Sequence, residues 1–104
     1  MVANLIRRMK PFYTTDLGAA YLGDARKTLQ KLPDESVNLI MTSPPYALHF
    51  KKEYGNVEKH EYVSWFLEFA KQFHRVLKSD GSLVIDIGGS YKKGLPTRSL
   101  YHFR

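Results

Sequence analysis

The sequence predicts an α/β fold, and two observations carry this prediction. Short apolar stretches alternate with longer helical patterns in the order strand, helix, strand, helix, strand. The helical connections are long enough for right-handed crossovers between parallel strands. A chain of 104 residues has room for one domain. We therefore expect residues 1–104 to form an incomplete three-layer parallel sheet flanked by helices.

The first predicted strand and helix follow an irregular arm. Residues 1–16 mix basic and aromatic side chains without a clean period, so we assign them no regular structure. Residues 19–22 suit a short strand, and residues 25–32 suit a helix that Pro33 ends. Asp24 is placed to cap this helix, because its carboxylate can accept hydrogen bonds from the free amides of the first turn.

The later elements have stronger patterns. Residues 37–41 are almost continuously apolar and short, which favours a strand covered on both faces. Residues 61–77 show a helical period, residues 78–81 contain a glycine that should end the helix, and residues 82–87 suit the next strand. The side chains expected to form the helix's core stripe are Val63, Phe66, Leu67, Ala70, Phe73 and Leu77, widened by Trp65, Phe69 and Val76.

Each predicted strand is followed by residues that suit a binding site. These are residues 23–24, 42–46 and 88–91. The carboxyl ends of parallel strands meet at one edge of a sheet, and open α/β sheets bind their ligands beyond that edge. We therefore expect the three segments to lie together.

Composition limits the classes of function. The net charge of +6 favours a polyanionic partner such as a nucleic acid, and residues 90–104 form a basic segment without an acidic residue, at what reads as a truncated end. The absence of cysteine excludes disulfides and cysteine-ligated zinc. The four histidines show no ligand spacing, so no metal is assigned. No run approaches the ~20 apolar residues of a membrane span, and we expect a cytoplasmic protein with no membrane partner.

The stretch "TSPPY", residues 42–46, is the most informative motif. Neither proline can donate a backbone hydrogen bond, and the residue before each proline is held extended, so the loop is stiff. The Ser43 hydroxyl and the Pro44 carbonyl can both accept hydrogen bonds, and Tyr46 offers a flat ring beside them. These groups suit a planar ligand that carries an amino group, such as a nucleobase. A plain turn or a proline-rich ligand is the alternative interpretation.

The motif and its surroundings resemble the amino-terminal half of prokaryotic DNA amino-methyltransferases of restriction–modification systems. The resemblance is carried by "YLGDARKTLQKLPDESVNLIM", by "TSPPY" and by "EYVSWFLEFAKQFHRVLKSDGSLVIDIGGSY", and it covers most of the chain. The serine form of the motif is similar to that of the N4-cytosine enzymes, whereas N6-adenine relatives usually have aspartate there. The resemblance implies a Rossmann-like methyltransferase fold and a prokaryotic, nucleoid-associated protein.

The implied activity is methyl transfer from S-adenosyl-L-methionine to the N4 amine of a cytosine flipped out of double-stranded DNA. The resemblance implies that the catalytic residues are Ser43, Pro44, Pro45 and Tyr46. It also implies that Asp24, Thr42 and Ser43 contact the cofactor, although capping alone explains Asp24 equally well. Lys51 and Lys52 are candidates for phosphate contacts, and a solvated loop is an equal alternative.

This family also requires a glycine-rich cofactor loop of the form Phe-x-Gly-x-Gly, which this sequence does not contain. We therefore expect a second polypeptide, or a carboxy-terminal half, to supply the loop, and a homo-oligomer is possible. Two alternatives stay open. One is N6-adenine specificity, and the other is a catalytically inactive DNA-binding or assembly domain.

Overall fold

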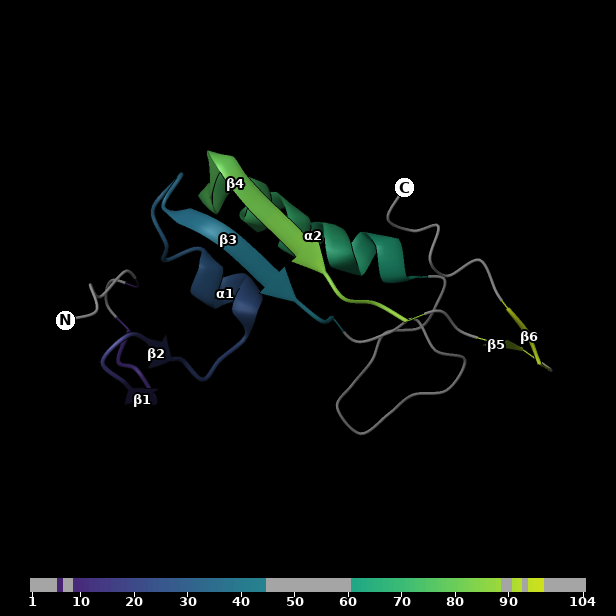
Figure 1. The fold of residues 1–104 in the computed structure, drawn as a ribbon, viewed down its shortest axis with the longest axis horizontal. Coiled ribbons are helices and arrows are strands. Elements are labelled where there is room, and N and C mark those ends of the chain that lie inside the picture. The colour runs from purple at the N-terminus through teal and green to yellow at the C-terminus, as the bar shows by residue number, and fades with distance from the viewer. Residues whose placement is uncertain (1–5, 7–8, 45–60, 89–90, 93, 97–104) are drawn as a thin grey trace.

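The computed structural model describes residues 6, 9–44, 61–88, 91–92 and 94–96. Their elements, in chain order, are β1 (Tyr13–Thr14), β2 (Ala19–Ala20), α1 (Ala25–Leu29), β3 (Val37–Thr42), α2 (Tyr62–Val76), β4 (Leu77–Ile85), β5 (Tyr91–Lys92) and β6 (Leu95–Pro96) (Figure 1). In this part of the chain, no helix is long and apolar enough to cross a membrane.

The centre of the fold is a parallel pair of strands, β3 and β4. Their register pairs Ile40 with Leu83 and Thr42 with Ile85. The Asp86 amide continues the ladder by donating to the Thr42 carbonyl at 2.9 Å. The prediction of parallel strands at residues 37–41 and 82–87 is therefore confirmed.

The described elements form two layers instead of the expected three. Helices α1 and α2 both lie behind the β3–β4 pair (Figure 1). Ile40 and Ile85 pack against the core on that side, whereas Met41 on the opposite side is 74% exposed. The one crossover that connects the two parallel strands is α2, and α1 packs beside α2. Both helices therefore lie on the same side, and none of the described elements covers the opposite face of the strand pair.

The strand predicted at residues 19–22 is confirmed at Ala19–Ala20, but it does not join the parallel sheet, and that part of the prediction was wrong. Ala19–Ala20 instead pairs antiparallel with Tyr13–Thr14, inside the stretch that was assigned no regular structure. The Phe12 amide donates to the Ala20 carbonyl at 2.7 Å, and the Thr15 amide donates to the Gly18 carbonyl at 2.8 Å. A tight turn at residues 15–18 therefore gives this strand a partner close in sequence.

Helix α1 is shorter than predicted, because the residues after Leu29 form hydrogen bonds to the third residue back instead of the fourth. It ends at Leu29, and the amides of Lys31 and Leu32 then donate three residues back, each at 3.0 Å. Arg75 of α2 satisfies the carbonyls left at this end, donating to Leu29 at 2.7 Å and to Leu32 at 2.8 Å. The end of α1 is thereby attached to the last turn of α2.

Helix α2 carries the core, but the predicted stripe is rotated. Its buried residues are Tyr62, Phe66, Phe73 and Val76. Val63 and Leu67 were expected in the core, yet they are 44% and 50% exposed. They lie outside the core because the ring contacts of the helix select the face that contains Tyr62 and Phe66, which stack at 6.4 Å between centroids.

The predicted helix end at residues 78–81 was wrong, because α2 ends at Val76 and residues 78–81 lie inside β4, which begins directly after it. The register shifts here, because Val37 pairs with Leu77 and Leu39 pairs with Ser82. Residues 78–81 therefore stand opposite the single residue Asn38. The chain approaches its neighbours so closely at Gly81 that a Cβ atom would lie 3.0 Å from the Lys78 carbonyl oxygen and 3.1 Å from that of Asn38.

We expect Gly81→Ala to lower the free energy of unfolding by about 1–3 kcal/mol, because the added methyl group meets two backbone oxygens that cannot move independently. Urea denaturation followed by circular dichroism measures this loss. Gly18→Ala is the matched control, since its Cβ would meet nothing nearer than the Thr15 hydroxyl at 3.6 Å. Equal stability of the two variants would contradict the close approach at Gly81.

Beyond β4, Tyr91–Lys92 and Leu95–Pro96 pair antiparallel, with Gly94 between them at a φ of 78°. That backbone conformation favours glycine. The rest of the basic segment, residues 90, 93 and 97–104, lies outside the described residues.

Candidate active site

Part of the "TSPPY" motif is placed at the carboxyl end of β3. Thr42 is the last residue of the strand, Ser43 is exposed and Pro44 is buried. Pro45, Tyr46, Lys51 and Lys52 lie outside the described residues. The structure therefore places Ser43 directly after the last residue of β3, and it leaves the expected stacking ring and phosphate contacts as predictions.

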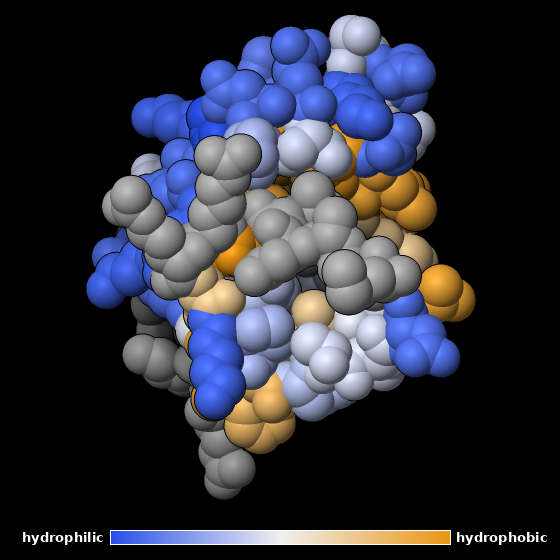
Figure 2. Space-filling view, turned by 90° about the vertical axis from the view of Figure 1, so that its left-hand side faces the viewer, coloured by the Kyte–Doolittle hydropathy of each residue, from blue (hydrophilic) through white to orange (hydrophobic). Residues whose placement is uncertain are grey.

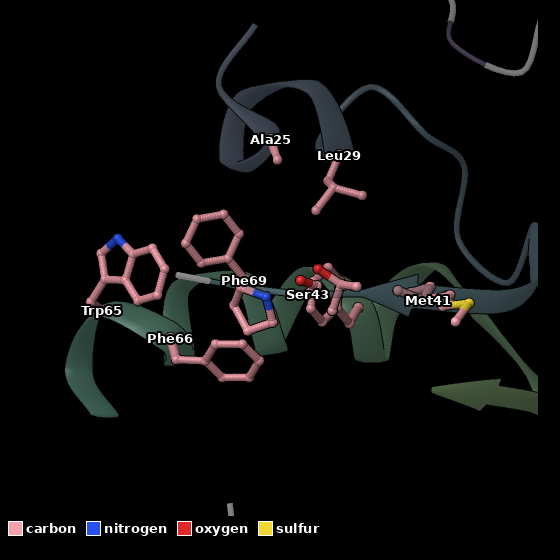
Figure 3. A pocket seen from close by; sticks show the side chains of 11 residues that line it. Ala25, Leu29, Met41, Ser43, Trp65, Phe66 and Phe69 are labelled. Carbon is pink, nitrogen blue, oxygen red and sulfur yellow. The ribbon is translucent and has the colours of Figure 1, made fainter. Parts of the chain in front are cut away.

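A pocket of about 330 Å³ opens beside the motif. Three elements line it, as Figure 3 shows: β3 with the residues after it, α1 and α2. The lining residues are Ala25, Leu29, Ile40, Met41, Thr42, Ser43, Pro44, Trp65, Phe66, Phe69 and Phe73. This volume is at the lower end of the range for small-molecule sites, and it suits a group the size of one or two rings.

The pocket wall on α2 is aromatic. The Trp65 and Phe69 rings meet edge to face at a centroid distance of 5.0 Å, and Phe66 lies 6.4 Å from Trp65. These rings were interpreted as core, which is confirmed for the buried Phe66 and Phe73. Their second role as pocket wall was missed. The sequence signal that could have revealed this role is the position of three rings on the first turns of the helix after the motif, at Trp65, Phe66 and Phe69.

Asp24 caps α1, as predicted. Its carboxylate accepts from the Arg26 amide at 2.9 Å. The Arg26 guanidinium also donates to both carboxylate oxygens, the shortest distance being 2.7 Å to Oδ2. The side-chain hydrogen bonds from Arg26, followed by its backbone hydrogen bond, lower the pKa of Asp24 from 3.8 to about 2.

Arg26 connects this cap to the aromatic wall. Its Nη1 donates to Glu68 of α2 at 2.8 Å, and its guanidinium carbon lies 5.7 Å from the centroid of the Phe69 ring. The two carboxylates raise the pKa of Arg26, so the group stays charged. Sequence reasoning singled out neither Arg26 nor Glu68, because the contact spans 42 residues.

We expect Arg26→Gln to return the pKa of Asp24 toward 3.8, because it removes the largest cause of the shift. In the unsubstituted chain the carboxylate stabilises the folded state above pH 3.8, and this contribution is lost as the pH falls from 3.8 to about 2. An NMR titration of the Asp24 carboxyl carbon measures the change. Lys27→Gln is the control, since Lys27 is the weakest of the causes. Equal shifts in the two variants would contradict the pairing.

The expected site is thus assembled only in part. Residues 42–44 and 87–88 share one edge, since β3 and β4 run parallel and Asp86 bonds to Thr42. Asp24 does not follow a parallel strand, which corrects the prediction. It is nevertheless brought toward the same pocket, because its neighbour Ala25 lines the wall and its partner Arg26 lies over Phe69. In the described part of the chain, no three His, Asp or Glu side chains group as a metal site.

Comparison with known proteins agrees with this geometry. The DNA methylase family of the N6/N4 type matches residues 37–103. The chain is 60% identical over 95 residues to the type II methyltransferase M.PvuII of Proteus hauseri, covering 91% of this chain and 28% of the relative. It is 36% identical over 85 residues to M.BamHI of Bacillus amyloliquefaciens, covering 79% of this chain and 20% of that relative.

The solved structure of the PvuII DNA methyltransferase, described as cytosine-N4-specific, superposes with a TM-score of 0.74 at 58% identity. The match covers 93% of this chain and 34% of that structure. The chain therefore spans about a third or less of the length of these relatives. Because the family match includes more than half of the chain, with the motif inside it, this protein belongs to the N6/N4 DNA methylase family.

Proposed function

We propose that the chain is a component of a DNA amino-methyltransferase that methylates the N4 amine of cytosine in double-stranded DNA. The observation that carries the proposal is the placement of Ser43 and Pro44 at the carboxyl end of β3, on the rim of a pocket with an aromatic wall. The similarity to a structure described as cytosine-N4-specific supports the choice of base.

The chain's own residues would act by hydrogen bonding and by positioning. An exocyclic amine is a poor nucleophile, because its lone pair is conjugated into the ring of the base. Hydrogen bonds from the amine to the Ser43 hydroxyl and the Pro44 carbonyl favour a tetrahedral nitrogen whose lone pair is free to attack. Tyr46 would stack on the flipped base and offset part of its unstacking. Pro45 keeps the loop stiff, so these groups need little reorganisation.

The proposed cofactor is S-adenosyl-L-methionine, which supplies a methyl group on a positively charged sulfur. The described residues fit one part of it, because the apolar pocket wall suits a planar ring system. Thr42 and Ser43 are proposed cofactor contacts at the rim. Asp24 fits less simply, since Arg26 already donates four hydrogen bonds to its two oxygens. Asp24 would accept from a cofactor hydroxyl only after Arg26 releases one of these contacts.

The same assignment implies two further partners. The net charge of +6 suits double-stranded DNA, and Lys51 and Lys52 are proposed phosphate contacts beside the motif. The glycine-rich loop required by the family is proposed to come from another polypeptide segment. The relatives are much longer than the matched region, which supports this requirement.

Transfer of radiolabel from S-adenosyl-L-methionine to unmethylated DNA tests the proposal. The chain is assayed alone and together with the part of the PvuII methyltransferase that it does not match, and the DNA is then digested to nucleosides. We expect N4-methylcytosine in the mixture and little or no product from the chain alone. Labelled adenine without labelled cytosine would show that the assignment to cytosine is wrong and that adenine is the methylated base. That outcome has support from 41% identity over 66 residues to the DNA adenine methyltransferase YhdJ of Escherichia coli.

A second candidate function is a DNA-binding or assembly domain without catalysis. The observation in its favour is that the chain contains no Phe-x-Gly-x-Gly pattern. This alternative predicts salt-dependent DNA binding, no affinity for S-adenosyl-L-methionine, and no methyl transfer in the mixture. Calorimetry with the cofactor therefore separates the two functions.

A further inference from the structure

We propose that Arg26 blocks Asp24, and that a donor group of the cofactor reaches the Asp24 carboxylate only when Arg26 shifts toward Glu68. We call these three side chains the latch. The inference rests on the proposed function, in which Asp24 contacts S-adenosyl-L-methionine, and it adds the residue that regulates this contact. Because Arg26 acts through Asp24, it is a positioning residue.

Arg26 occupies both oxygens of the Asp24 carboxylate. Its amide and its Nε donate to Oδ1 at 2.9 and 3.1 Å, and its Nε and Nη2 donate to Oδ2 at 3.2 and 2.7 Å. Two hydrogen bonds on each oxygen use the lone pairs that a carboxylate offers. A hydroxyl or amino group that approaches Asp24 must therefore displace one of these donors. The Nε contacts yield first, because they are the longest and share a single hydrogen.

The same guanidinium has a second carboxylate within reach. Its Nη1 donates to Oε2 of Glu68 at 2.8 Å. Arg26 can therefore give up part of its contact with Asp24 and stay paired with Glu68. The side chains of Arg26, Asp24 and Glu68 are 39%, 35% and 56% exposed, and ion pairs with this exposure are weak enough to exchange partners.

The latch lies beside the pocket. Ala25 and Phe69, which neighbour Arg26 and Glu68 in the chain, both line the pocket (Figure 3). The Arg26 guanidinium carbon lies 5.7 Å from the centroid of the Phe69 ring. In Figure 2, hydrophilic side chains predominate along the left of the molecule, the side of α1 and α2, so the bridge between these helices borders solvent. A ligand whose ring enters the pocket therefore brings its donor groups into competition with Arg26 for Asp24.

Quenching of Trp65 fluorescence by adenosine tests the latch in this chain. Trp65 is the only tryptophan of the sequence and lines the pocket, so a ring that enters should quench it. We expect Arg26→Gln to raise the affinity for adenosine about threefold, because a weak exposed ion pair no longer competes. Glu68→Gln should lower this affinity about twofold, because Arg26 then loses the acceptor that receives it.

The matched control ligand is 9-methylpurine, which has a planar ring but no N–H or O–H donor. Its affinity should be the same in all variants. Lys27→Gln removes a positive charge from the same helix and should leave adenosine binding unchanged. Arg26→Lys keeps the charge but offers one compact donor group, so its gain should be smaller than that of Arg26→Gln. Circular dichroism checks that each variant is folded.

Two further ligands identify the donor group that reaches Asp24. Purine riboside lacks the amino group of adenosine, and adenine lacks the hydroxyls. The ligand that loses the threefold gain in Arg26→Gln lacks the group that binds Asp24. Near pH 7 Asp24 stays ionised in this variant, because its pKa returns only toward 3.8, so the gain measures access to the carboxylate.

Three outcomes overturn the inference. The first is weaker adenosine binding in both Arg26→Gln and Glu68→Gln, as expected of a bridge that only stabilises the pocket. The second is an equal gain for adenosine and 9-methylpurine, and the third is no quenching by adenosine in any variant. Failure of the proposed function gives a different result. If the two variants change adenosine affinity in opposite directions, yet the mixture with the unmatched part of the PvuII methyltransferase transfers no methyl group, the latch stands and the catalytic role is refuted.

Discussion

Replacing Ser43 by alanine should lower methyl transfer by about two to three orders of magnitude in the reconstituted enzyme, the usual cost of losing one hydrogen-bonding group that acts in a transition state. The Ser43 hydroxyl is exposed at the end of β3, beside the pocket, where it can accept a hydrogen bond from the amine of the base. The measurement is the initial rate of radiolabel transfer at saturating DNA and cofactor. The circular dichroism spectrum of the variant should be unchanged, because Ser43 is exposed and lies outside the core.

The control for this prediction is another exposed serine. Ser64 lies on the exposed side of α2, and Ser64→Ala should keep the full rate. Ser43→Thr retains a hydroxyl and should recover part of the activity. If Ser43→Ala transferred methyl groups as fast as Ser64→Ala, the hydroxyl would have no role in the chemistry, and the assignment of the motif would be refuted.

Truncation of Phe73 to alanine should lower the free energy of unfolding by about 3–5 kcal/mol, because it removes a buried ring and leaves a cavity in the core. Phe73 is 7% exposed and meets Phe66 edge to face at 6.2 Å. A small domain is stable by only about 5–15 kcal/mol in total. A loss of this size should therefore leave a substantial fraction of the chain unfolded at 37 °C.

The measurement for Phe73→Ala is chemical denaturation of the chain, followed by circular dichroism. Leu67→Ala is the control on the same helix. Leu67 is 50% exposed, and alanine favours the helix, so the cost should stay within about 1 kcal/mol. Equal losses for the two substitutions would mean that the core does not lie on the face of α2 that contains Phe66 and Phe73.

Strong local patterns explain what could be predicted. The apolar run at residues 37–41 and the long helical period ending near Val76 were placed to within about one residue of β3 and α2. The cap at Asp24 was also predicted correctly, because capping depends on neighbouring amides alone. The weaker alanine-containing strand was assigned to the wrong sheet, since the short turn at residues 15–18 offered a nearer partner.

By itself, the sequence determined the order of the main elements, the family resemblance and the hydrogen-bonding groups that the "TSPPY" motif offers, because these depend on residues that are close along the chain. Only the tertiary structure showed that α1 and α2 lie on the same side of the β3–β4 pair, whereas Leu39 and Val84 on the opposite side are 56% and 44% exposed. It also brought the rings of Trp65 and Phe69 beside Ser43 and joined Arg26 to Glu68. The physical reason is that periodicity shows which side of an element is apolar, whereas the partner of that side is chosen by packing between residues far apart in sequence.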